Sequence, residues 1–204
     1  MLTVVPTKSL LLIVDFQSRL MPSIDQGTAA VKNAKRLIDM AELIDVPIVF
    51  TEQNAKGLGA TVDDLPISAG RIMHKMTFDA VREPDFLGAI PADRHIVVAG
   101  CEAHVCVLQT VLGLLDAGRK VYVVRDALGS RQPESKETAI RRMERHGAEI
   151  VTTEMVVFAP HARLGVPGFD RKFGGLVAGK VALPYSSTGS EQSVTVFGAR
   201  SRFS

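Results

Sequence analysis

The sequence lacks tryptophan altogether, and aromatic residues make up only 5% of its 204 residues. A platform that stacks the bases of single-stranded nucleic acid is built from aromatic rings, so their scarcity argues against one. The net charge is only +2, which gives no strong attraction to nucleic acid or to a membrane surface. The apolar run at residues 10–14 is far too short to span a bilayer. We therefore predict no nucleic acid and no membrane among the partners.

Cysteine is also scarce, with two residues, Cys101 and Cys106. They lie five residues apart across an expected turn, a spacing that does not favour a structural disulfide. A low cysteine content without a recognisable signal peptide is typical of a reducing compartment. We therefore expect a cytoplasmic protein.

The remaining composition is that of an ordinary globular protein, with 46% hydrophobic and 23% charged residues. Up to about residue 158, apolar runs typical of strands alternate with helical patterns. The expected strands are 9–14, 46–51, 71–74, 96–99, 120–124 and 148–152, and the expected helices are 27–45, 82–90, 105–117 and 135–146. Such alternation predicts an α/β fold in which helices cover both faces of a parallel sheet.

The composition changes at about Ala159, after which glycine, serine and arginine dominate. The segment S-S-T-G-S at 186–190 is typical of a flexible linker. We predict one domain at 1–158 and an irregular C-terminal arm or tail at 159–204. Such an arm could wrap a neighbouring subunit, and an altered reading frame would explain the change equally well.

Polar residues follow several of the expected strands. Asp15, Glu52 with Gln53, Lys75 and the segment 101–106 each come directly after one, with residues 52–59 expected as a loop. Ligands of open parallel sheets bind beyond the carboxyl ends of the strands. We therefore expect these residues to gather at one edge of the sheet.

Cys106 is the candidate nucleophile. The apolar run 96–99 breaks at Gly100, and a helical pattern resumes at Val105, so Cys106 falls in the first turn of a helix. The partial positive charge of a helix N-terminus is expected to lower the pKa of this thiol. The unpaired N–H groups there could hold the oxyanion of an acyl-transfer intermediate. Cys101, before the turn, is more typical of a buried core residue.

A cysteine nucleophile needs a base and a charge partner. Asp15, buried at the end of a strand, can take the proton, and Lys75 can stabilise the charged pair. Together with Cys106 they form a chemically sufficient triad without a histidine. Each residue also has a structural interpretation: a turn residue for Asp15, a solvated lysine for Lys75 and a small buried side chain for Cys106.

Five segments strengthen the hydrolase interpretation. They are L-L-I-V-D-F-Q at 11–17, T-E-Q-N-A-K-G-L-G at 51–59, H-K-M-T-F-D-A at 74–80, G-C-E-A-H-V-C-V-L-Q-T at 100–110 and D-A-L-G-S-R at 126–131. Together they resemble the isochorismatase-like cysteine hydrolase superfamily, which includes nicotinamidases, N-carbamoylsarcosine amidases and many unassigned hydrolases. Each segment alone is a weak signal, but their joint occurrence within residues 8–158 is specific.

The resemblance implies a three-layer α/β/α sandwich with a six-stranded parallel sheet, a Rossmann-like arrangement, and a homo-oligomer. It also implies roles for three residues: Asp15 as base, Lys75 as charge stabiliser and Cys106 as nucleophile. A cis peptide bond is implied within the nucleophile turn, and we expect it between Glu102 and Ala103.

We also expect particular groups to hold a substrate. The N–H groups of Cys106 and Ala103 are expected to bind the oxyanion. Phe16, Gln53 and Phe78 are candidates to line the pocket. Core packing is the alternative interpretation for the two phenylalanines, and a solvated loop position is the alternative for Gln53.

The sequence also departs from the family. Nicotinamidases carry a metal site after the second strand, whereas residues 52–54 here are Glu-Gln-Asn, without a histidine pair. We therefore predict no metal and no cofactor, and nicotinamide is a less favoured substrate. Ala103 replaces a threonine found in many members.

The favoured function is hydrolysis of a small carboxamide through a thioester intermediate. One alternative is hydrolysis of a vinyl ether in an isochorismate-type substrate, which needs a carboxylic acid but not the cysteine. Another is a non-catalytic binding or redox-sensing protein, with Cys106 as an oxidation-prone thiol.

Overall fold

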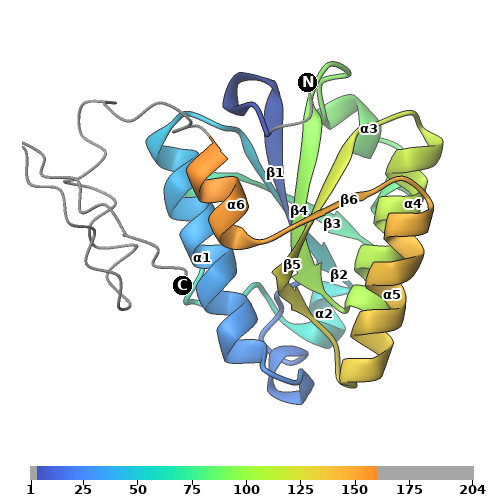
Figure 1. Cartoon of the computed structure of the whole chain (residues 1–204). Coiled ribbons are helices and arrows are strands. Elements are labelled where there is room, and N and C mark those ends of the chain that lie inside the picture. The colour runs from blue at the N-terminus through green and yellow to red at the C-terminus, as the bar shows by residue number, and fades with distance from the viewer. Residues whose placement is uncertain (1–3, 160–204) are drawn as a thin grey trace, which may run out of the picture. The chain divides into compact units, whose positions relative to one another are not determined.

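The computed structural model describes residues 4–159 (Figure 1). The arm predicted at 159–204 therefore lies outside the described residues, apart from its first residue. The domain boundary expected after residue 158 stays a prediction.

Six strands form one sheet, and every neighbouring pair is parallel. The strands are β1 (Ser9–Val14), β2 (Ile48–Gln53), β3 (Arg71–Lys75), β4 (His95–Cys101), β5 (Val121–Gly129) and β6 (Glu149–Val151), in the order β3-β2-β1-β4-β5-β6. Every residue of β1 is buried, as expected of a central strand covered on both faces. The predicted α/β fold with a six-stranded parallel sheet is confirmed.

Helices cover both faces of this sheet (Figure 1). One face carries α1 (Gly27–Leu43) and α6 (Thr153–Phe158), and the other carries α3 (Phe86–Ala89), α4 (Leu108–Asp116) and α5 (Pro133–Arg145). In α1, the spacing typical of an amphipathic helix turns one side toward the sheet, burying Ala30, Ala34, Leu37, Ile38 and Ala41. Among residues 4–159, no helix has the length and apolar character needed to cross a membrane.

Two predictions near the second strand were wrong in their bounds. β2 begins at Ile48 instead of Val46, because Pro47 has no N–H to donate to a strand ladder. It continues through Glu52 and Gln53, which were expected in a loop and instead pair with the last two residues of β3. The short helix α2 (Ala55–Leu58) occupies the middle of the predicted loop.

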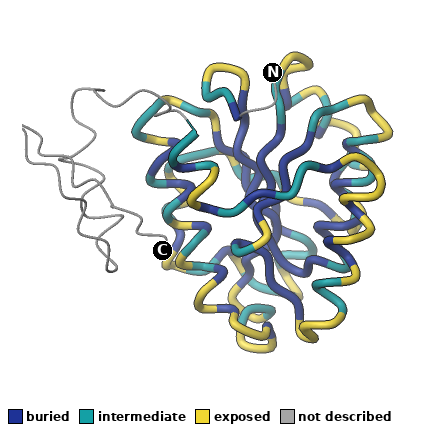
Figure 2. The backbone as a smooth tube through the Cα atoms, in the orientation of Figure 1, coloured by how far each residue is buried: buried dark blue, intermediate teal, exposed yellow. Residues whose placement is uncertain are grey.

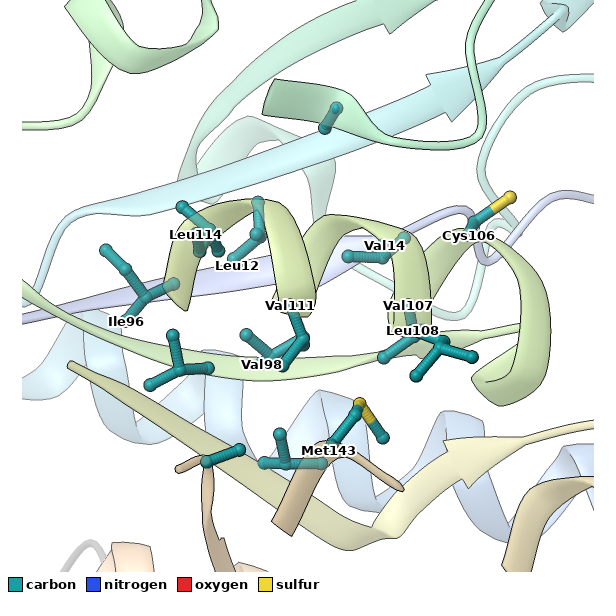
Figure 3. Packing of buried hydrophobic residues seen from close by; sticks show 14 of the residues in the cluster. Leu12, Val14, Ile96, Val98, Cys106, Val107, Leu108, Val111, Leu114 and Met143 are labelled. Carbon is teal, nitrogen blue, oxygen red and sulfur yellow. The ribbon is translucent and has the colours of Figure 1, made fainter. Parts of the chain in front are cut away.

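The core lies between the central strands and the helices α4 and α5, and the strands are the most continuously buried part of the chain (Figure 2). In Figure 3, Val14 and Val98 from the sheet lie close to Val111 of α4. Full burial of each such side chain contributes about 1.5–3 kcal/mol. This packing anchors α4, and with it the turn that precedes α4, to the sheet.

Gly100 allows β4 to approach β1 closely. A Cβ atom at this position would lie 2.6 Å from the carbonyl oxygen of Val14 and 3.0 Å from Cγ2 of Val107. Only glycine fits such contacts without displacing backbone. The close approach brings the end of β1 next to the turn that follows β4.

Candidate active site

Asp15 directly follows β1, and its carboxylate is fully buried. Its φ of +50° is a left-handed conformation that is uncommon for a residue other than glycine. Its backbone N–H donates to the carbonyl oxygen of Thr51 over 3.1 Å, and its Oδ1 accepts a 2.7 Å hydrogen bond from Thr51 Oγ1. One residue of β2 therefore holds both the backbone and one carboxylate oxygen of Asp15.

Lys75, the last residue of β3, forms a buried ion pair with Asp15. Its Nζ lies 2.6 Å from Asp15 Oδ2 and also donates to the carbonyl oxygens of Thr77, at 3.2 Å, and Phe78, at 3.3 Å. All three donors of the ammonium group therefore have partners. Removing one member of a buried pair leaves the other charge unpaired, at a cost of about 3–5 kcal/mol. Each residue thus holds the other in place.

The thiol of Cys106 lies near enough to Asp15 and Lys75 for both side chains to act on its pKa. The structure therefore brings the three predicted residues together from β1, β3 and the turn after β4. Burial raises the pKa of the Cys106 thiol to about 12; the negative charge of Asp15 adds to the rise, and the charge of Lys75 opposes it. The predicted lowering of this pKa was wrong, because burial and the neighbouring carboxylate outweigh the positive helix terminus.

Cys101 occupies the interior, as predicted. Its side chain is fully buried at the end of β4, and burial raises the pKa of its thiol above the ordinary range. It sits against Gly129, where a Cβ atom would approach its Sγ to 2.8 Å. Cys101 is therefore a packing residue.

The cysteine turn, which we define as residues 102–107, begins earlier than predicted. Helical structure starts with a π-helical turn at Ala103–Val107 and continues directly into α4, whereas the expected start was Val105. The cis peptide bond joins Cys101 and Glu102, one residue before the expected position. Within residues 4–159, the N–H groups of Ala103 and His104 have no hydrogen-bond acceptor.

The three residues expected to line a pocket occupy different environments. Phe16 is fully buried, so its side chain belongs to the interior, in line with its alternative interpretation. Phe78 is 55% exposed, and Met76 beside it is 72% exposed. Gln53 is partly buried, and its Nε2 donates to the carbonyl oxygen of Met76 over 3.4 Å. Phe78 and Gln53 thus remain available at the carboxyl edge of the sheet.

Gln17 is a site residue whose role the sequence did not reveal. This buried side chain donates from Nε2 to the carbonyl oxygens of Gly59, at 2.6 Å, and Gln53, at 3.1 Å, and its Oε1 accepts from the N–H of Gln53. It therefore clamps the end of β2 and the segment after α2. Its place in the D-F-Q motif, next to Asp15, was the only signal for it.

Glu52 is a second buried carboxylate near the site. Its Oε1 accepts hydrogen bonds from the N–H and Oγ1 of Thr61, and its Oε2 lies 3.4 Å from Nδ1 of His74. Among residues 4–159, no three histidine, cysteine or acidic side chains gather as a metal site would require. The expectation that the protein needs no metal stays a prediction.

One hollow on the domain is lined by none of Asp15, Lys75 and Cys106. It has a volume of about 720 Å³ and lies between the first half of α1 and the segments 18–22 and 60–64. The buried group of Asp15, Lys75 and Cys106, and not this hollow, is the candidate active site.

A family model described as "Isochorismatase domain" matches residues 9–155, a range that includes the whole sheet and the three residues of the triad. A parallel sheet of this order, with helices on both faces, is a three-layer α/β/α fold. The chain belongs to the isochorismatase family of hydrolases.

Curated relatives support the assignment. Human isochorismatase domain-containing protein 2 is 36% identical over 155 residues, which cover 76% of each chain. Zebrafish isochorismatase domain-containing protein 1 is 33% identical over 155 residues, which cover 74% of this chain and 55% of the relative. The chain thus spans about half the length of the zebrafish relative.

Solved structures share the fold. The MAR1 ribonuclease of Caenorhabditis elegans superimposes with a TM-score of 0.79 at 29% identity, over 92% of this chain and 99% of that one. The YcaC gene product of Escherichia coli, described as an octameric hydrolase of unknown specificity, gives a TM-score of 0.80 at 23% identity, over 87% and 92% of the two chains.

Proposed function

We propose that this protein is a cysteine hydrolase that cleaves the C–N bond of a small carboxamide through a thioester. The observation that carries the proposal is the Cys106 thiol beside the buried Asp15–Lys75 ion pair, whose two charges act on it. With a pKa of about 12, the thiol is neutral at physiological pH. A neutral thiol is a weak nucleophile and needs a base beside it, and Asp15 occupies that place.

In the first step, Asp15 takes the thiol proton as Sγ of Cys106 attacks the carbonyl carbon. Lys75 stabilises the charges on sulfur and carboxylate during the transfer. The C–N bond then breaks, and the leaving amine takes the proton from Asp15. The products of this step are a free amine and a thioester on Cys106.

The negative oxygen formed by the attack needs hydrogen-bond donors. The N–H group of Ala103, which has no acceptor within residues 4–159, and that of Cys106 lie in the turn that carries the sulfur. Removing one donor from such a site in other enzymes costs about 2.7–4 kcal/mol of barrier height. These N–H groups are the proposed oxyanion hole.

Hydrolysis of the thioester completes the cycle. Asp15 takes a proton from a water molecule whose oxygen attacks the thioester carbon. The C–S bond breaks, and the sulfur recovers its proton from Asp15. The acid product leaves, and the neutral thiol is restored.

A redox-sensing role receives less support. Sensor cysteines have a low pKa and an accessible sulfur. The side chain of Cys106 is only 6% exposed, and the pKa of its thiol is raised. Slow oxidation is expected of such a group.

Anionic substrates are also less favoured. An isochorismate-type dicarboxylate, or the phosphates of RNA, would need cations that are free to bind them. Lys75 already pairs with Asp15, and Arg131, beside the cysteine turn, already pairs with Glu102. A neutral carboxamide needs no free cation in order to bind.

The test replaces Cys106 by alanine and measures hydrolysis across a library of small carboxamides, with mass spectrometry to trap the acyl-enzyme. We expect turnover and the covalent adduct both to vanish, while the circular dichroism spectrum is unchanged. Cys101→Ala is the matched control and should keep both. Full turnover of a carboxamide by Cys106→Ala would exclude the cysteine mechanism.

A further inference from the structure

Glu102 connects the cysteine turn to the rest of the molecule in two ways. Its backbone carbonyl oxygen accepts hydrogen bonds from the N–H groups of Val105, at 3.1 Å, and Val107, at 3.2 Å, within the turn. Its side chain, although only 6% of the residue is exposed, points out of the turn and binds Arg131. A single residue therefore organises the turn internally and ties it to another segment.

The tie to Arg131 has a specific geometry. The backbone N–H of Arg131, at 3.0 Å, and its side-chain Nε, at 2.9 Å, both donate to the same oxygen, Oε2 of Glu102. Burial alone would raise the pKa of Glu102, but the hydrogen bonds and charge of Arg131 hold this pKa below its ordinary value. Glu102 is therefore ionised at neutral pH, and charge strengthens both hydrogen bonds.

A second link runs parallel to the first. Nδ1 of His104 lies 3.1 Å from Oγ of Ser130. Ser130 is buried, and its carbonyl oxygen accepts a 3.0 Å hydrogen bond from the N–H of Asp25, which precedes α1. The segment that receives both links is thus itself fixed to the domain.

The two links come from Glu102 and His104, the residues on either side of Ala103. The N–H of Ala103, which has no acceptor within residues 4–159, belongs to the proposed oxyanion hole. Neither link touches the triad, since Asp15 and Lys75 are held by β2 and by the segment after β3. The Asp15–Lys75 pair is therefore held by contacts separate from those that tie Glu102 and His104 to residues 130–131.

We propose that Glu102 is a positioning residue, which by binding Arg131 holds the cysteine turn so that its N–H groups face the substrate oxygen. This inference rests on the proposed function, because it concerns the oxyanion formed in the same acyl-transfer step. Glu102 touches no reacting atom and acts through the backbone of Ala103 and Cys106.

Two reagents separate the orientation of the turn from the reactivity of the sulfur. p-Nitrophenyl acetate acylates a thiol through an oxyanion and releases one equivalent of nitrophenolate. Iodoacetamide alkylates the same sulfur by displacement of iodide, without an oxyanion. The ratio of the two rate constants at Cys106, with the alkylated peptide identified by mass spectrometry and Cys106→Ser as the blank, therefore reports on the oxyanion hole.

The variants dissect the link. Glu102→Ala removes both hydrogen bonds and should lower the acylation rate by about 100-fold, the loss expected from a displacement of about 1 Å, while alkylation changes less than threefold. Glu102→Gln keeps an oxygen that can accept both hydrogen bonds without the charge, so its acylation rate should recover to within about tenfold of wild type. Arg131→Met, which keeps the backbone N–H but loses Nε, should fall between the two.

The control is Glu137→Ala, which removes a partly exposed carboxylate that accepts a 2.8 Å hydrogen bond from Arg125. It should leave both rates unchanged. Equal acylation by wild type and Glu102→Ala would overturn the inference while leaving the proposed function intact, and so would a parallel loss of both rates in Glu102→Gln with native circular dichroism. Absence of any Cys106-dependent nitrophenolate burst in the wild type would reject the proposed function and this inference with it.

Discussion

At the scale of single residues, the environment of Cys106 decides the chemistry that the site can perform. Burial and the charge of Asp15 raise the pKa of its thiol, and Lys75 lowers it without reversing the effect. The thiol therefore keeps its proton in the resting protein, and the free energy of removing this proton is part of the reaction barrier. The base that removes it must lie within reach of the sulfur. The buried Asp15–Lys75 pair provides that base in a fixed position.

Replacing Asp15 by asparagine has opposite expected effects on thiol reactivity and on turnover. Without the carboxylate the pKa of Cys106 falls toward its ordinary value, so alkylation by iodoacetamide at pH 8 should become at least several-fold faster. Turnover should be lost, because no base remains for the thiol or for water. The alkylation rate between pH 6 and 10 checks the first effect, and the rate of hydrolysis by the same variant checks the second.

Asp64→Asn, which changes an exposed acid at the same edge, is the control for this experiment. It should leave the alkylation profile and turnover unchanged. Lys75→Met should shift the profile the other way, to higher pH, because the stabilising cation is gone. A thiol profile indifferent to both Asp15 and Lys75 would show that the three residues do not share one site.

At the scale of elements, the spacing between β1 and β4 sets the distance between base and nucleophile. We expect Gly100→Ala to destabilise the fold by about 1–3 kcal/mol, as overpacking of a core does, because its Cβ would lie 2.6 Å from Val14 O. The displacement of β4 relative to β1 should also reduce turnover. Urea denaturation and initial rates measure the two effects.

Gly88→Ala is the matched control, because a Cβ atom there meets no atom within 4 Å. It should leave turnover unchanged, and it should not destabilise the fold through overpacking. If Gly100→Ala were as stable and active as this control, the close approach of β4 to β1 would not be needed to build the site.

At the scale of the whole molecule, we propose that the protein forms a homo-oligomer and that residues 159–204 act as an arm between subunits. The second part of the proposal is motivated by the change of composition at about residue 159. Sedimentation velocity should show a species larger than one chain, and a chain ending at residue 159 should form a smaller one. A full-length monomer at tens of micromolar would contradict the first proposal, and unchanged assembly of the shortened chain would contradict the second.

The sequence by itself determined the alternation of strands and helices, because buried parallel strands and amphipathic helices have distinct hydrophobic periods. It also placed Asp15 and Cys106 after strands, and parallel strands end at a common edge. Lys75 was expected just after a strand at 71–74 and is instead the last residue of β3. Its errors lay at element ends: Glu52 and Gln53 extend β2 because β3 offers a ladder to pair with, and pairing partners are not visible locally.

Only the tertiary structure decided the electrostatics of the site and the contacts that orient it. A helix N-terminus, which the local sequence indicates, favours a thiolate, but burial and a carboxylate 91 positions earlier in the chain reverse the result. Likewise, Glu102 and Arg131 are separated by 29 residues, and only folding brings them together. Periodicity is a property of neighbours along the chain, whereas desolvation and ion pairing depend on which distant residues share the same space.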